Sequence, residues 1–247
     1  SLLDNDPLRK LLNELIDFKR IDRNIRSGAL TALSVDASCY NNSRSVSFFQ
    51  ASRDIENWTR ARRSGERMML NTEHLLASSA IPMVFPSIKL NQAYYGDGSV
   101  HQLAPLSSPI HLGAEKLLVI NLESPHKHFP MELEYHPKTA SIAGHLLDTI
   151  FSDTLNSDLE RLERINNTLS LIPESSRNKL ALHPIKTLVI KPSEDLSKIA
   201  ARFYDDMPWA VKTLLGFIGI DKQSDSSIVS YLLFEKTYTS ELIDLGY

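Results

Sequence analysis

Residues 74–122 read HLLASSAIPMVFPSIKLNQAYYGDGSVHQLAPLSSPIHLGAEKLLVINL, and this stretch decides the fold class. It opens with a short helix pattern that ends near Pro82, because the residue before a proline is biased away from helical geometry. A strand pair at 87–95 then runs into Gly96-Asp97-Gly98-Ser99. After a second short helix pattern, the apolar run 116–122 is typical of a parallel-sheet strand buried on both faces. This alternation predicts an α/β fold.

The residues upstream of this stretch extend the same fold. Residues 29–40 and 46–51 have strand character, and Asn41-Asn42-Ser43 between them is typical of a turn, so we expect a hairpin. Residues 54–70 are polar and include arginines at 60, 62, 63 and 67. We expect a helix there, whose arginines form either a solvated face or a contact for phosphate head groups.

The character of the chain changes after residue 124. Apolar residues spaced by three and four predict one long helix over 139–171. A strand at 185–190 and helical segments at 207–220 and 228–245 follow. We therefore expect two parts, a mixed α/β part over 1–124 and a mainly helical extension over 125–247.

Composition excludes several classes of protein. The chain has 247 residues, a net charge of −3 and a single cysteine. It has no global basic field that would indicate nucleic-acid binding, and it cannot form an intrachain disulfide. No apolar run approaches the roughly 18–20 residues of a spanning helix, and the first ten residues do not resemble a signal peptide. We expect a cytoplasmic protein, with contact at a membrane surface left open.

The Gly96-Asp97-Gly98 motif has two interpretations. Asp-Gly is a common turn dipeptide, so these residues alone favour a structural turn. The alternative is a functional carboxylate at a strand tip, because glycine on each side lets Asp97 approach a partner without interference from Cβ atoms.

Several motifs surround Asp97, and others lie in the C-terminal residues. They are Leu76–Pro82, Phe85-Pro86, Tyr95–Ser99, Ala104–Ser107, Leu112–Ala114, Ile142–His145, Lys191–Leu196 and Ser230–Phe234. Together they resemble the motifs of bacterial patatin-like phospholipases. The similarity runs over residues 1–122, is densest at 74–121, and continues in the C-terminal extension.

This resemblance implies a three-layer α/β/α sandwich that hydrolyses lipid or other acyl esters with a Ser–Asp dyad. The aspartate of the family's D-G-[GA] motif matches Asp97, which would deprotonate the nucleophile without an intervening histidine. Gly96, Gly98 and Ser99 would form its supporting loop, with Ser99 replacing the usual small third residue. The resemblance implies no metal and no organic cofactor.

The nucleophile motif of such enzymes is missing from this sequence. A nucleophile elbow needs G-x-S-x-G, and no two glycines of this chain are four residues apart. The glycine-rich loop that would supply oxyanion donors is missing as well. We therefore interpret the chain as the C-terminal portion of a longer hydrolase and expect it to be inactive alone. The alternative is a non-catalytic scaffold that self-associates through the 139–171 helix.

Other candidate sites are weaker. Cys39 lies in an expected strand and fits a small core residue better than a nucleophile. His74 and His101 flank the Asp97 region, where local packing explains them. The apolar segment 207–220 either is buried against the long helix or contacts a lipid interface through Trp209. A metal site is conceivable only in one proline-rich loop, at His126, His128, Glu132, Glu134 and His136.

Overall fold

The computed structural model describes residues 3–52, 54–82, 84–102, 104–122, 154–177, 179–180, 182–217 and 228–247. The chain divides into two compact units. The sheet unit comprises residues 1–115 and 154–185, and the helical unit comprises residues 116–153 and 186–247. The predicted division at residue 124 stays a prediction, because that residue lies in the range 123–153, outside the described residues.

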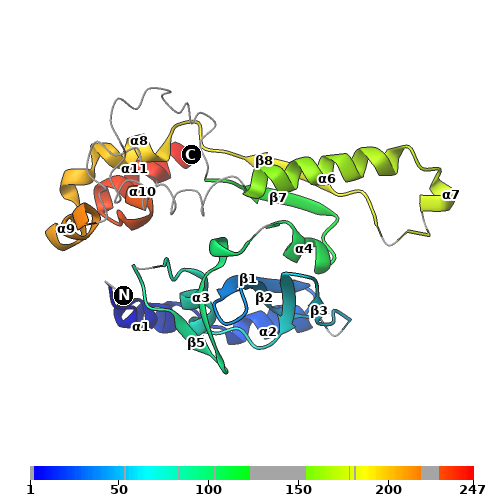
Figure 1. Cartoon of the computed structure of the whole chain (residues 1–247), viewed down its shortest axis with the longest axis horizontal. Helices are drawn as coiled ribbons and strands as arrows, with labels where there is room; N and C mark the ends of the chain where they lie inside the picture. The colour runs from blue at the N-terminus through cyan, green and yellow to red at the C-terminus, as the bar shows by residue number, and fades with distance from the viewer. Residues whose placement is uncertain are drawn as a thin grey trace. The chain divides into compact units, whose positions relative to one another are not determined.

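A six-stranded sheet forms the centre of the sheet unit (Figure 1). Its spatial order is β3-β4-β2-β1-β6-β5, and only the β2–β4 pair is parallel among the pairs described. The α/β class predicted from the sequence is thereby confirmed. The strands are β1 (Ala32–Cys39), β2 (Arg44–Ala51), β3 (Trp58–Thr59), β4 (Arg63–Arg67), β5 (Ile88–Leu90) and β6 (Ala93–Asp97).

One face of this sheet carries the hydrophobic core. Buried Ala37, Val46 and Phe48 pack there with Leu76 and Ala77 of a short helix, and partly buried residues of the two N-terminal helices join them. Alternate strand residues point to opposite faces, so a single strand can supply this core and a different set of side chains on its other face. The helices of the core face are α1 (Asp6–Leu15), α2 (Lys19–Arg26) and α3 (Thr72–Ser78).

The other face of the sheet carries the segment that follows β6. Ser108 Oγ donates a hydrogen bond to Ser34 Oγ on β1 (2.9 Å), and Leu106 N donates to Asp158 Oδ2 (3.0 Å). These bonds attach the segment to the sheet and to a long helix. The elements concerned are η1 (Gly98–Val100), α4 (Ser107–His111), α6 (Thr154–Ser170) and α7 (Glu174–Arg177).

The expected helix over 54–70 is wrong, because these residues form β3 and β4. Parallel pairing with β2 decides the outcome: Ser45 N donates to Arg62 O (3.0 Å) and Met68 N donates to Phe49 O (2.9 Å). Gly65 makes the hairpin compact, since a Cβ there would lie 2.3 Å from the Trp58 indole. Tertiary pairing thus overrides the polar local pattern.

The helical unit contains a two-stranded parallel sheet of β7 (Lys116–Ile120) and β8 (Lys186–Ile190). The two predicted strands and the parallel-sheet character expected of the first are confirmed, but burial of 116–122 on both faces is wrong. Leu118 and Ile120 are 63% and 71% exposed, because no described element covers their face.

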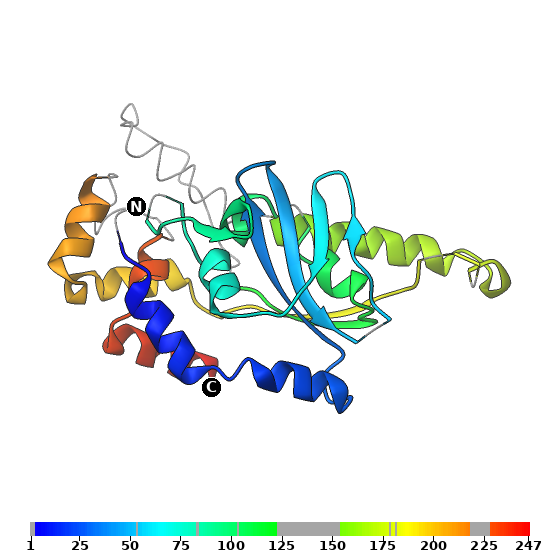
Figure 2. The ribbon, with the colours of Figure 1, turned by 90° about the horizontal axis from the view of Figure 1, so that it is seen from below.

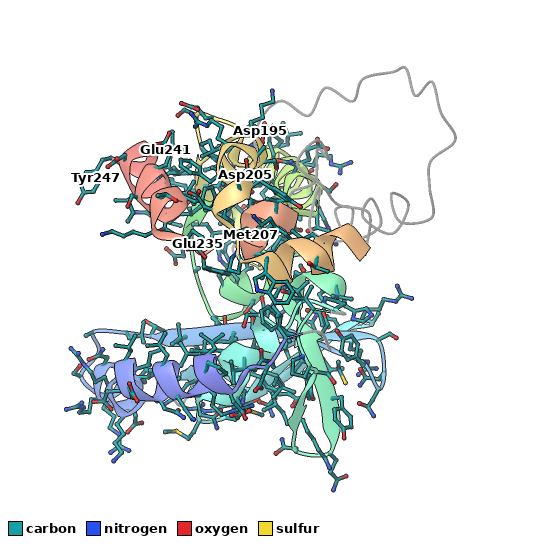
Figure 3. The ribbon with its side chains drawn as sticks, turned by 90° about the vertical axis from the view of Figure 1, so that its left-hand side faces the viewer. Asp195, Asp205, Met207, Glu235, Glu241 and Tyr247 are labelled. Carbon is teal, nitrogen blue, oxygen red and sulfur yellow. The ribbon has the colours of Figure 1, made fainter. Side chains whose placement is uncertain are left out.

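A series of short helices follows β8 in this unit and includes helices within the expected helical segments 207–220 and 228–245. Asp195 caps the first of them by accepting from Ser197 N (2.9 Å), and Arg202 pairs with Glu241 of the last helix (3.1 Å) (Figure 3). Of the predicted 139–171 helix, α6 confirms the C-terminal part, and 139–153 lie outside the described residues. The helices are α8 (Leu196–Arg202), η2 (Tyr204–Asp206), α9 (Trp209–Phe217), α10 (Ile228–Leu232) and α11 (Lys236–Gly246).

Candidate active site

Asp97 ends β6 and caps the short turn η1. Its Oδ1 accepts two hydrogen bonds from Ser99, one from the backbone N (2.9 Å) and one from Oγ (2.6 Å). Among the described residues no donor binds Oδ2 of this half-buried carboxylate. The arrangement fixes one carboxylate oxygen and leaves the other able to accept a proton from outside the turn.

Three further hydrogen bonds fix the backbone around Asp97. Asp97 N donates to Ala80 O just beyond α3 (3.0 Å). Ser38 Oγ, fully buried on β1, donates to Gly98 O (3.1 Å) and accepts from His101 N (3.0 Å). The turn is therefore held on both sides by residues distant in sequence.

The two glycines beside Asp97 are required for space within the chain. A Cβ on Gly96 would lie 2.0 Å from Tyr40 Oη, and a Cβ on Gly98 would lie 2.6 Å from Asp36 O. Neither glycine has a positive φ. From the sequence, these glycines were expected to let a partner approach Asp97. In the structure they instead make room for β1 and Tyr40.

Burial raises the pKa of Asp97, and the two hydrogen bonds from Ser99 oppose this effect only in part. A raised pKa makes the carboxylate a stronger base. Ser99 therefore orients Asp97 and leaves it basic.

Asp36 is a second half-buried carboxylate, and no sequence pattern singled it out. It lies on β1 one residue from Ala37, the register partner of Asp97. Gln102 Nε2 donates to Asp36 Oδ2 (2.9 Å), and burial raises the pKa of Asp36. Tyr40, also missed, lies over Gly96, and burial together with the charge of Asp97 raises the pKa of its phenol. Neither residue has a local sequence signal, because strand pairing alone brings them to the turn.

The other sequence candidates among the described residues bring no side chain to this site. Cys39 is buried in the hydrophobic core, and His74 stabilises the start of α3, where its Nδ1 accepts from Asn71 N (3.2 Å). His101 contributes its backbone N to the turn, as described above. The candidate metal residues from His126 to His136 lie outside the described residues. In the described part of the chain, no group of three or more His, Cys, Asp or Glu could hold a metal.

The comparisons with known proteins bear on the first part of the chain. No curated protein and no solved structure matches it. The model of one family, described as Patatin-like phospholipase, matches residues 1–110, a range that contains β1 to β6 and Asp97. The mixed sheet with its helices is consistent with a patatin-like α/β/α fold. Residues 1–110 are thus similar to the patatin-like phospholipases, which supports the family expected from the sequence.

Proposed function

We propose that this chain carries the aspartate half of a lipid acyl hydrolase that uses a Ser–Asp dyad. Asp97 is the base, and the nucleophilic serine and the oxyanion donors come from residues outside this chain. The observation that carries the proposal is the Asp97 carboxylate, whose Oδ1 is held by Ser99 while Oδ2 has no donor among the described residues. The match of residues 1–110 to the phospholipase family supports a lipid ester as substrate.

The proposed reaction needs only proton transfer and acyl transfer. The serine hydroxyl gives its proton to Asp97 Oδ2 while Oγ attacks the ester carbonyl. Protonated Asp97 then returns the proton to the leaving alkoxide, which departs as the alcohol and leaves an acyl-serine. Water attacks the acyl-serine in the second half, with Asp97 accepting its proton and then protonating the serine.

The test uses the longer protein that joins this chain to a G-x-S-x-G segment. A fluorophosphonate probe should label a serine outside residues 1–247. Asp97→Asn should lower kcat for ester hydrolysis by about 10²–10⁴-fold, because the base is lost while shape is retained. The matched control is Asp54→Asn, since Asp54 is exposed in the β2–β3 connection.

Three results would contradict the proposal. They are ester turnover by the 247-residue chain alone, no labelled serine in the longer protein, and more than a tenth of parental activity in Asp97→Asn. Absence of labelling would favour the alternative, a scaffold that associates through the 139–171 helix.

A further inference from the structure

Three turns meet at one end of the six-stranded sheet. The β1–β2 and β3–β4 turns lie at the same end in Figure 2 and are joined by the bond from Ser45 N to Arg62 O. The β5–β6 turn is tied to the first of them, because Tyr94 N donates to Asn41 Oδ1 (2.8 Å) and Tyr40 N donates to Tyr94 O (2.9 Å). We call this surface the turn rim and define it by residues 40–44, 59–63 and 89–94.

The turn rim is basic and contains no carboxylate. Its three segments include five cations, Arg44, Arg60, Arg62, Arg63 and Lys89, but no Asp or Glu. None of these five forms an ion pair with another described residue, although the charge of Arg63 acts on Asp158. By contrast, Arg9, Arg23, Arg26 and Arg202 all form ion pairs. Arg60, Arg62 and Lys89 are exposed. The positive charge is therefore available to an external anion, although the whole chain is acidic.

Two tyrosines lie among these cations. Tyr40 and Tyr94 are 41% and 48% exposed. Arginine, lysine and exposed tyrosine together are typical of a surface at the level of lipid head groups, where the amphipathic phenol is favoured. Tyr40 also lies over Gly96 beside Asp97, so the rim adjoins the candidate base.

We propose that the turn rim binds the surface of an anionic bilayer. Arg60, Arg62 and Lys89 contact lipid phosphates, and Tyr40 and Tyr94 enter the head-group layer. β6 runs from the rim to Asp97, a distance of about 13 Å at roughly 3.3 Å per residue. The choice of lipid over nucleic acid rests on the proposed function, whereas the binding itself does not require Asp97 to be catalytic.

Vesicle co-sedimentation of the 247-residue chain tests this proposal. The chain should bind vesicles of phosphatidylcholine with 30% phosphatidylglycerol better than neutral phosphatidylcholine vesicles, and binding should fall as NaCl rises from about 0.05 to 0.5 M. The double variant Arg60→Glu/Arg62→Glu should bind the anionic vesicles at least about thirtyfold more weakly, since each basic residue near such a surface contributes about fivefold.

The matched control is Lys19→Glu/Arg20→Glu. It changes the net charge equally, and its two residues are exposed on α2, which precedes β1 and lies at the opposite end of the strands (Figure 2). It should bind like the parent. If the rim variant loses its circular dichroism spectrum, Arg60→Gln/Arg62→Gln replaces it, with at least a tenfold loss expected.

Four outcomes would overturn the proposal. They are equal binding to neutral vesicles, equal loss in both charge-reversal variants, competition by soluble glycerol phosphate at low millimolar concentration, and tighter binding of a DNA or RNA duplex than of vesicles. The two proposals have separate readouts. Asp97→Asn tests the proposed base through ester hydrolysis and should leave vesicle binding at the parental level, whereas the rim variants test vesicle binding.

Discussion

The Ser38 hydroxyl offers the sharpest test of how the Asp97 turn is held. Ser38→Ala removes the donor to Gly98 O and the acceptor of His101 N. Ser38 is fully buried, so water cannot replace the hydroxyl. Leaving the buried Gly98 carbonyl unpaired costs about 1–3 kcal/mol. The loss of the bond from His101 N costs less, because His101 N still donates to Ser99 O. We expect the free energy of unfolding to fall by about 2–3 kcal/mol.

The assay is urea unfolding followed by tryptophan fluorescence. The chain has two tryptophans, and Trp58 lies in the sheet unit, stacked between Phe49 and His111. In a Trp209→Phe background the signal therefore reports the unit that contains Ser38. With a urea dependence of about 2 kcal/mol per M, the midpoint should fall by roughly 1–1.5 M.

Ser45→Ala is the matched control for this experiment. Ser45 is the register partner of Ser38 and is 2% exposed, but its side chain makes no hydrogen bond among those of the described residues. It should cost less than about 1 kcal/mol. If Ser38→Ala shifts the midpoint no further than Ser45→Ala does, the Ser38 hydroxyl does not hold the turn.

Four further predictions follow from single sites. Burial lowers the pKa of His74 below 6.5, so the stability that neutral His74 contributes is present above that pH and is lost as the pH falls through the lowered pKa. Between pH 7.5 and 5 the urea midpoint should therefore drop more for the parent than for His74→Gln. Burial raises the pKa of Asp36 above 3.8, so the parent should gain stability relative to Asp36→Asn as pH falls from 7 toward 4; a pH-independent difference would contradict this. Gly65→Ala should cost about 1–3 kcal/mol and shift Trp58 emission, because the new Cβ would lie 2.3 Å from the indole; an unchanged spectrum would disprove the contact. Trp209 is 79% exposed on α9, so Trp209→Ala should weaken vesicle binding if this helix contacts lipid. Binding at the parental level would show that Trp209 makes no such contact.

The sequence predicts those elements of the fold whose signals are local. The Asn41-Asn42-Ser43 turn gives the β1–β2 hairpin, and Asn71, a residue type favoured at helix N-termini, caps α3 by accepting from Glu73 N (3.0 Å). The strands at 88–97 and the parallel strands β7 and β8 also lie where the apolar patterns place them. In each case the residue types within the segment, a turn residue, a cap or an apolar run, favour the backbone conformation that the segment adopts.

Elements whose geometry depends on distant partners were not predicted correctly. β4 looks polar and helical by itself, yet its backbone pairs with β2 and its Gly65 makes room for Trp58. The exposure of Leu118 and Ile120 could not be predicted either, because an apolar run does not indicate which face of the strand a neighbouring element covers. Long-range pairing and coverage are properties of the folded chain.

The same distinction applies to the candidate site. Gly96-Asp97-Gly98 predicts a turn with an accessible carboxylate, and that much follows from local chemistry. The features that support Asp97 as the proposed base come from residues far away in sequence: Ser38 and Ala80 fix the turn, and burial raises the pKa of Asp97. Because Ser99 binds Oδ1 only, burial and one-sided hydrogen bonding together leave Oδ2 basic and unoccupied by any described donor. One-sided bonding also occurs at an ordinary helix cap, as at Asp195, so the proposal that Asp97 is a base rests on the available Oδ2 together with the pKa that burial raises.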